Sequence, residues 1–147
     1  MARAKQQLKL AEFLPYQLSI TSNAISDLIA RAYRGRFALK IPEWRLMAVL
    51  GEVSSATQRQ LVAATAMDKV TVNRASKALE DRGLIGRAPN AADGRSHHLA
   101  LTDTGRELYD QIVPLALSVE AELVNSDEAK ALEAMLARLR ARVAELG

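Results

Sequence analysis

The sequence predicts a mainly α-helical fold with one small β-hairpin. Apolar residues make up 49% of the 147 positions, which suits a packed core and is too high for a disordered chain. Most apolar side chains recur at the three- and four-residue spacing of amphipathic helices. The exceptions are two short runs, residues 84–88 and 97–101, which flank a segment rich in the turn formers Pro, Asn, Asp and Gly. We therefore expect helices on both sides of a single hairpin.

Two helices are expected in the first third of the chain. The first begins at Pro15, a residue type that suits the first helical turn, and its apolar pattern continues until Gly35 breaks it. The second begins at Pro42 and fades after Gly51.

Two further helices, joined by a short break, are expected before the hairpin. Thr57 and Gln60 have the spacing of a capping box at the start of a short helix. Asp68 can cap a longer helix from Lys69 to about Arg82, and Gly83 suits the residue that closes it. A short and a longer helix joined by a tight turn form a helix-turn-helix, and a hairpin after them is a wing. Other all-α folds with one β-ribbon have the same order of elements.

Two helices are expected after the hairpin. Thr102 can cap the first, in which Pro114 predicts a kink, and Ser126 or Asp127 begins the second. A continuous apolar stripe on the last helix needs a partner surface in so short a chain, which predicts a homodimer, although packing within the chain could cover part of it. The stripe consists of Leu132, Met135, Leu136, Leu139 and Val143.

Charge is distributed unevenly along the chain. Residues 1–102 hold 15 Lys and Arg against 8 Asp and Glu, whereas residues 103–147 hold 5 against 9. A basic first part and an acidic last part suggest that the first part binds a polyanion, with ordinary surface variation as the alternative.

Several classes of protein are disfavoured by the sequence. It contains no cysteine, which excludes disulfides, thiolate metal sites and thiol switches. No G-x-S-x-G elbow, phosphate-binding glycine loop or metal-spaced His/Glu set is present, so we expect no enzyme and no cofactor. His97 and His98 point to opposite faces of a strand and cannot chelate one metal ion together. No secretory signal or apolar run of ~20 residues occurs, so a cytoplasmic location without membrane contact is expected.

The helix predicted over residues 69–82 has two distinct faces. Its inward face should consist of Val72, Ala75, Ser76 and Leu79. Its outward face should consist of Lys69, Val70, Asn73, Arg74 and Lys77. Such side chains can donate hydrogen bonds to base edges and phosphates, and a valine can contact a thymine methyl group. The alternative is an ordinary solvated face with one stray valine.

The hairpin tip offers a second candidate contact with DNA. Asp93 can brace the guanidinium of Arg95, and an arginine on a protruding tip suits a narrow, A·T-rich minor groove. An ordinary surface salt bridge is the alternative. The full set of candidate DNA-binding residues is Gln58, Arg59, Lys69, Val70, Thr71, Asn73, Arg74, Lys77, Asp93, Arg95, Ser96 and His97.

Three segments resemble the MarR family of winged helix-turn-helix bacterial transcription regulators. Residues 93–102 have the form D-x-R-x-x-x-x-x-L-T of that family's wing and are followed by Gly105-Arg106. Residues 79–85 resemble the end of its recognition helix, and residues 42–45 the start of its second helix. The resemblance covers roughly residues 10–145. It implies a winged lobe over residues 41–101, with residues 1–40 and 102–147 forming a dimer interface.

The resemblance also implies a partner DNA and a small-molecule effector. Two identical recognition helices would bind a pseudo-palindromic operator on double-stranded DNA, and we expect a repressor. Proteins of this kind often bind small aromatic or amphipathic acids where the dimerisation helices meet the winged lobe. Residues at this position are Ser19, Asn23, Tyr33, Trp44 and Arg45. For Trp44 a core anchor, and for Arg45 an interhelical salt bridge, are the alternatives. A ligand-independent architectural DNA-binding protein would share the fold.

Overall fold

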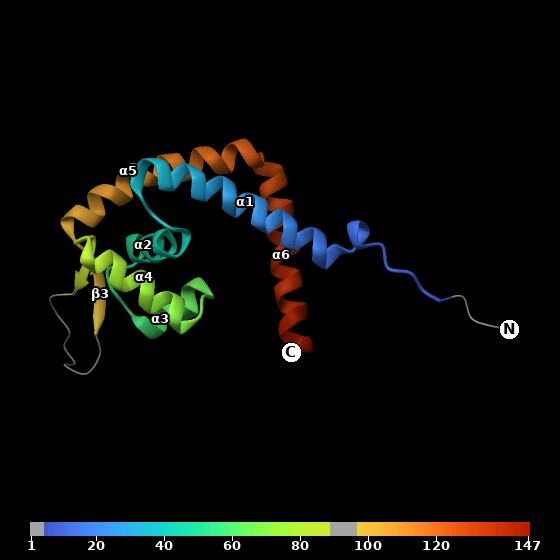
Figure 1. The fold of residues 1–147 in the computed structure, drawn as a ribbon, viewed down its shortest axis with the longest axis horizontal. Coiled ribbons are helices and arrows are strands. Elements are labelled where there is room, and N and C mark those ends of the chain that lie inside the picture. Colours follow the sequence, from blue (N-terminus) through green and yellow to red (C-terminus); the bar gives the residue numbers. More distant parts are fainter. Residues whose placement is uncertain (1–4, 89–96) are drawn as a thin grey trace. The chain divides into compact units, whose positions relative to one another are not determined.

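The computed structural model describes residues 5–88 and 97–147. The chain divides into two compact units, residues 1–108 and residues 109–147. The element order, with the labels of Figure 1, is η1 (Leu10–Glu12), α1 (Leu14–Phe37), α2 (Ile41–Glu52), β1 (Ala56–Thr57), α3 (Gln58–Thr65), α4 (Lys69–Asp81), β2 (Ile85–Arg87), β3 (His98–Leu101), α5 (Asp103–Leu123) and α6 (Ser126–Leu146). The mainly α-helical fold with a small β-element is confirmed.

Within residues 5–88 and 97–147 the sheet has three strands, whereas the sequence predicted only the hairpin. Strand β3 lies between β1 and β2 and is antiparallel to both. Strand β1 pairs Ala56 with Leu99 and Thr57 with His98. With two residues, β1 is too short for a visible alternation of apolar and polar side chains. It forms because Thr57, the extended residue before α3, can pair with β3 while its side chain caps the helix.

Helix α1 continues past Gly35, so the predicted break there is wrong. The helix ends at Phe37, and Ala38 then adopts the left-handed conformation with φ 52°. Phe37 is buried and Leu39 is fully buried. A glycine inside a helix costs only about 1 kcal/mol, which is less than the gain from burying a large apolar side chain. Packing beyond Gly35 therefore determines where α1 ends.

The predicted helix caps of the helix-turn-helix are confirmed. The Thr57 hydroxyl accepts from the Gln60 N–H at 3.1 Å, and the Thr57 N–H donates to Gln60 Oε1 at 2.9 Å. Asp68 Oδ1 accepts from the Thr71 N–H at 2.7 Å. Hydrogen bonds from the backbone and the side chain of Thr71 hold the pKa of the Asp68 carboxyl below its usual value. Gly83 has φ 71°, as expected for the residue that closes α4.

Thr102 and Gly105 connect the sheet to α5. The Thr102 hydroxyl donates to the Gly83 carbonyl at 2.6 Å and accepts from the Gly105 N–H at 3.0 Å. A Cβ at Gly105 would collide with the carbonyl group of Leu84, so only glycine fits there. Pro114 lies inside α5, and the kink remains a prediction. Helix α6 begins at Ser126 as predicted.

The core of the first unit lies where α2, α3 and α4 pack against the sheet. The side chains that fill it are buried to 96% or more: Leu46, Met47, Leu50, Ala56, Leu61, Val72, Ala75, Leu79, Leu84, Ile85 and Leu99. This core fixes the position of α4 relative to α2 and α3.

The second unit contains the larger part of α5 and the whole of α6. No α6 side chain is buried. The apolar residues Leu132, Met135 and Val143 are 48%, 55% and 69% exposed. Among the described residues, no helix is long and apolar enough to cross a membrane.

Candidate nucleic-acid interface

Helix α4 has the two faces that its sequence predicted. Val72 and Leu79 are fully buried, and Ala75 and Ser76 are at most 4% exposed. Asn73, Arg74 and Lys77 are exposed together with Lys69 at the start of the helix. Val70, also at the start, is 59% exposed. The inward face anchors the helix in the core, so the outward face is held rigidly toward solvent.

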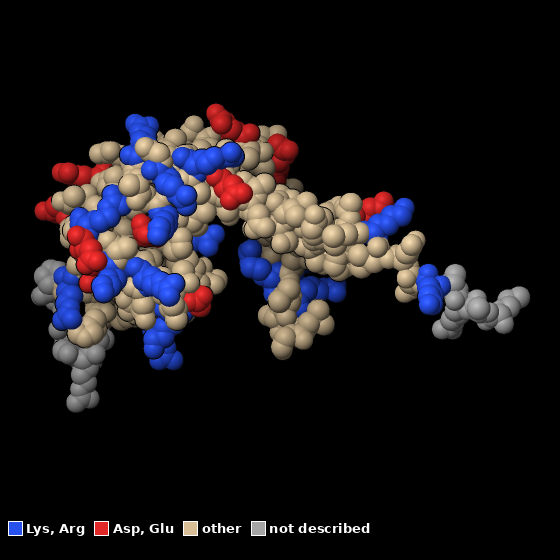
Figure 2. Space-filling view, in the orientation of Figure 1, with Lys and Arg blue, Asp and Glu red and all other residues tan. Residues whose placement is uncertain are grey.

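This outward face suits a DNA major groove chemically. Lysine and arginine can neutralise phosphates, and asparagine and arginine can make paired hydrogen bonds to base edges. Leaving Val70 in water brings no stabilisation, whereas a thymine methyl group would give it an apolar contact. Figure 2 shows many exposed basic side chains over the winged lobe, with acidic ones among them.

The start of α3 forms a hollow with the start of α4. This α3–α4 hollow has a volume of about 470 Å³ and is lined by Gln58, Arg59, Val62 and Lys69. Arg59 is exposed and Gln58 is half-buried. Gln58 Oε1 is buried and has no hydrogen-bond partner within residues 5–88 and 97–147. Three of the predicted DNA-binding residues, Gln58, Arg59 and Lys69, therefore lie together here.

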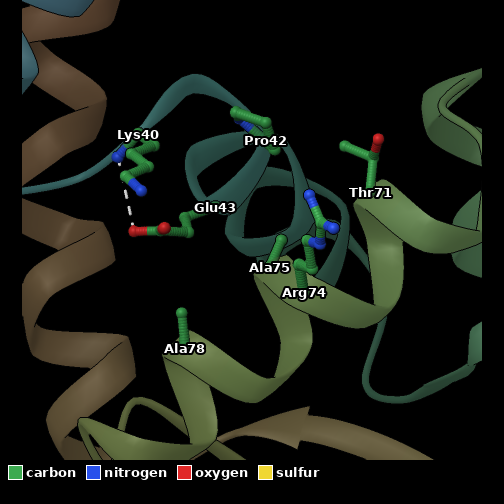
Figure 3. Close-up of a pocket in the computed structure, with 7 residues that line it drawn as sticks. All are labelled: Lys40, Pro42, Glu43, Thr71, Arg74, Ala75 and Ala78. Carbon is green, nitrogen blue, oxygen red and sulfur yellow. Dashed lines mark hydrogen bonds between the residues drawn. The ribbon is translucent and has the colours of Figure 1, made fainter.

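A second hollow lies between the start of α2 and α4 (Figure 3). This α2–α4 hollow has a volume of about 260 Å³, and its lining residues are Lys40, Pro42, Glu43, Thr71, Arg74, Ala75 and Ala78. Glu43 is only 8% exposed, and its Oε1 accepts from the Lys40 N–H at 3.3 Å. Thr71 and Arg74 are among the DNA-binding residues predicted from the sequence, whereas Lys40 is not.

Most of the predicted wing contact cannot be placed. Asp93, Arg95 and Ser96 lie outside the described residues. His97 is exposed next to β3, and the following His98 is half-buried. The His98 carbonyl accepts from the Ala88 N–H at 2.8 Å, which extends the pairing of β2 and β3.

Arg82 has a structural role at the end of α4. Its guanidinium donates to the carbonyls of Ala38 at 3.0 Å and Phe37 at 3.1 Å. These carbonyls lie at the end of α1, where a helix leaves its last acceptors without intrahelical partners. Arg82 therefore ties the end of α4 to the end of α1.

The structure brings together only part of the predicted ligand-binding set. The rings of Tyr33 and Trp44 meet edge to face at 5.4 Å between centroids. Tyr33 is 2% exposed, and burial raises the pKa of its phenol. Arg45 is exposed on α2. Ser19 and Asn23 are exposed on α1, about 21 and 15 Å along the helix axis from Tyr33 at 1.5 Å per residue. One small molecule cannot contact all five residues in one protomer.

Comparison with known proteins shows similarity to one family. The sequence profile of the MarR family matches residues 39–96. The transcriptional regulator HosA from Escherichia coli is 26% identical over 99 residues, covering 67% of this chain and 73% of HosA. A MarR/EmrR family regulator from Acinetobacter sp. has a TM-score of 0.85 and 26% identity, covering 94% of this chain and 99% of that one.

Two further solved structures share the fold at lower sequence identity. One belongs to a study of how 6-hydroxynicotinic acid regulates the DNA binding of BpsR from Bordetella bronchiseptica; it has a TM-score of 0.82 and 21% identity, covering 92% of this chain and 98% of BpsR. The other is a mutant MarR from Escherichia coli complexed with operator DNA, with a TM-score of 0.75 and 20% identity, covering 86% and 92%. The profile match over residues 39–96, the sequence relative and the shared fold together show that this chain is similar to the MarR family of transcriptional regulators.

Proposed function

We propose that this regulator is a dimeric, sequence-specific DNA-binding repressor whose affinity for its operator is lowered by a small anionic aromatic ligand. The observation that carries the proposal is helix α4, which buries one face in the core and exposes Asn73, Arg74 and Lys77 on the other. A rigid helix with this outward chemistry fits the floor of a major groove. The Escherichia coli MarR mutant, which shares the fold, was solved in complex with operator DNA, which supports a DNA-binding role for this chain.

The dimer is proposed from the exposed apolar residues of the chain ends. Leu132, Met135 and Val143 on α6 are 48–69% exposed, and Leu10 and Leu14 near the start of α1 are each 54% exposed. A second copy related by a two-fold axis would cover the same residues on both chains. The two α4 helices would then contact half-sites about one turn of DNA apart. In this arrangement the exposed apolar faces within residues 1–40 and 102–147 form the interface, and the DNA-binding surface centres on residues 41–101.

Fluorescence anisotropy with two duplexes tests sequence-specific binding. One duplex contains the DNA upstream of the protein's own gene, and the other is a shuffled sequence of equal length. At about 150 mM salt we expect binding to the first to be at least 10³-fold tighter, as for typical specific regulators. Equal affinities would favour the alternative, an architectural DNA-binding protein, and would contradict the repressor proposal.

The ligand site is proposed near the contact between Tyr33 and Trp44. This pair joins α1 to α2, so a ligand wedged beside it would change the position of the winged lobe relative to α1. Arg45, on the same helix as Trp44, offers a guanidinium to a carboxylate. The DNA binding of BpsR, which has the same fold, is regulated by 6-hydroxynicotinic acid. This likeness supports an aromatic acid as the proposed ligand. Ser19 and Asn23 lie too far along α1 to contact the same small molecule within this protomer.

A screen of aromatic acids and their thioesters, measured by release of the upstream duplex, tests the ligand. The ligand must prefer the form that does not bind DNA by several kcal/mol, because equal affinity for both forms shifts nothing. Arg45→Ala should weaken the response and leave DNA affinity without ligand unchanged, and Arg31→Ala, on the exposed surface of α1, is the matched control. If no compound changes the affinity even threefold, the ligand proposal is wrong.

A further inference from the structure

We propose that the α2–α4 hollow holds a phosphate of the DNA backbone and that Lys40 supplies a cation for it. This inference rests on the proposed DNA-binding function and adds a contact outside the recognition helix. The three observations behind it are the position of the hollow on α4, the small side chains that keep it open, and its charge.

The hollow lies on one flank of the outward face of α4. At 100° per residue, Val70, Asn73, Arg74 and Lys77 centre on one direction. Thr71 and Ala78 centre about 100° away, on the side where α2 packs against α4. Lys69 lies about 90° away in the opposite sense, next to Arg59 in the α3–α4 hollow. The outward face is therefore bordered by one hollow on each side.

A recognition helix in a major groove has a sugar–phosphate strand on each side. The groove is about 12 Å wide and a helix with its side chains is 10–12 Å across, so the flanks of the helix meet the two backbones. The α3–α4 hollow, with Arg59 and Lys69, would face one strand. The α2–α4 hollow would face the other, and Lys40 is the lysine that lines it.

Small side chains keep the α2–α4 hollow open. Thr71, Ala75 and Ala78 line it from α4, where longer side chains would fill the space (Figure 3). The Thr71 hydroxyl is hydrogen-bonded to Asp68, so it is not counted as a donor to the phosphate. The donor proposed for the phosphate is the ammonium of the exposed Lys40, while Arg74 adds positive charge at the border between the hollow and the outward face.

The charge of the hollow suits a phosphodiester. Its seven lining residues include two cations, Lys40 and Arg74, and one carboxylate, Glu43, which leaves a net charge of +1. Glu43 is 92% removed from solvent and accepts a hydrogen bond from the Lys40 backbone, so its carboxylate is engaged at the helix start. A phosphodiester carries one negative charge. The charge of the hollow therefore matches that of one backbone phosphate.

The experiment compares the salt dependence of DNA binding in the wild type, Lys40→Ala, Lys40→Arg and the control Lys130→Ala. Lys130 is an exposed lysine on α6, on the side of the helix opposite the apolar stripe, so the control removes an equal charge away from both the hollow and the proposed dimer contact. Each protein is titrated with the upstream duplex and with the shuffled duplex between about 50 and 200 mM salt. Circular dichroism melting confirms that every variant is folded.

Lys40→Ala should weaken binding to both duplexes by the same factor, because a phosphate contact does not depend on sequence. The slope of log affinity against log salt should become shallower by about 0.9 for each bound protomer. Over that fourfold salt range, the variant would lose about 3.5-fold less affinity per protomer than the wild type. Lys40→Arg should retain the wild-type slope, and Lys130→Ala should match the wild type.

The outcomes separate this inference from the proposed function. If the wild type binds the upstream duplex but Lys40→Ala has the wild-type slope, the phosphate contact is wrong and the proposed function stands. If the wild type binds neither duplex, both are wrong. If Lys40→Ala lowers affinity for the upstream duplex alone, Lys40 contacts a base and the phosphate assignment is overturned. Lys40-dependent binding of inorganic phosphate alone, in calorimetry without DNA, would indicate a site for a free anion and also overturn it.

Discussion

Helices α4 and α6 are both amphipathic, yet their apolar residues have opposite environments. In α4, Val72 and Leu79 are fully buried against the rest of the first unit. In α6, no residue is buried, and Met135 is 55% exposed. The 13-residue α4 thus buries its apolar face against elements of its own unit. The 21-residue α6 has no buried residue, so its apolar face is left exposed within its own unit.

Because of this difference, we expect the winged lobe to be stable on its own and α6 to need a partner surface. The winged lobe has a core of its own, so its shape should not depend on protein concentration. The apolar face of α6 gains stability only when a partner surface covers it, which is why we propose a second chain there. Substitutions in the two regions should consequently be detected by different measurements.

Leu79→Ala should have the largest effect on stability, because it removes a fully buried side chain from the core of the winged lobe. We expect the free energy of unfolding, measured by urea denaturation, to fall by about 2–5 kcal/mol. Val70→Ala on the same helix is the control, since Val70 is 59% exposed. Its effect should stay within about 0.5 kcal/mol. Equal losses in the two variants would contradict the burial of one α4 face.

Met135→Asp should dissociate the proposed dimer. A carboxylate buried in an apolar interface costs about 3 kcal/mol or more, which weakens association at least about 100-fold. Light scattering should give twice 16.0 kDa for the wild type and 16.0 kDa for the variant. Glu133→Gln, an exposed polar position on the same helix, should remain dimeric. A monomeric wild type at high concentration would refute the dimer.

Arg74→Ala should reduce discrimination between operator variants by roughly 1–3 kcal/mol if Arg74 makes a paired contact with a base. Arg95→Ala, at the hairpin tip predicted from the sequence, should instead weaken binding most where the flanking minor groove is narrow and A·T-rich. Anisotropy titrations against a panel of single-base variants measure both effects. A uniform loss in Arg74→Ala across the panel would show that this residue contacts only the backbone.

The smallest expected effect is the pH dependence of the α4 cap. The pKa of Asp68 is lower in the folded protein than in the unfolded chain, so the cap stabilises the fold above the unfolded value of about 3.8. This stability should disappear as the pH falls through the lower, folded pKa. Asp68→Asn keeps a capping oxygen without a titrating carboxyl. Thermal melts from pH 6 to 2.5 should show a slightly smaller loss for the variant than for the wild type.

The helices and most of their ends were predictable because local signals determine them. Thr57 with Gln60 and Asp68 with Thr71 make their capping bonds over three residues, so the spacing in the sequence was sufficient. The end of α1 was not predictable in this way. It depends on the burial of Phe37 and Leu39 and on bonds from Arg82, more than 40 residues away. Strand β1 was missed because it forms by pairing with the distant β3.

The part of the candidate site that lies on one helix could be predicted from the sequence. The prediction was incomplete where residues from several helices come together. The outward face of α4 follows from helical periodicity alone. Lys40 was missed because only the packing of α2 against α4 brings it next to Thr71 and Arg74. The candidate ligand-binding residues rested on the family resemblance. Two of them, Ser19 and Tyr33, lie about 21 Å apart along one helix.

Hydroxyl-radical footprinting of the wild-type protein on its own upstream DNA is the measurement that decides the proposed function. A dimer with two α4 helices should protect two segments related by a two-fold axis and centred about 10 base pairs apart. Both segments should lose protection together when Met135→Asp replaces the wild type at the same concentration. A single asymmetric protected segment, or symmetric protection by a protein that is monomeric on the DNA, would contradict a dimeric regulator with paired recognition helices.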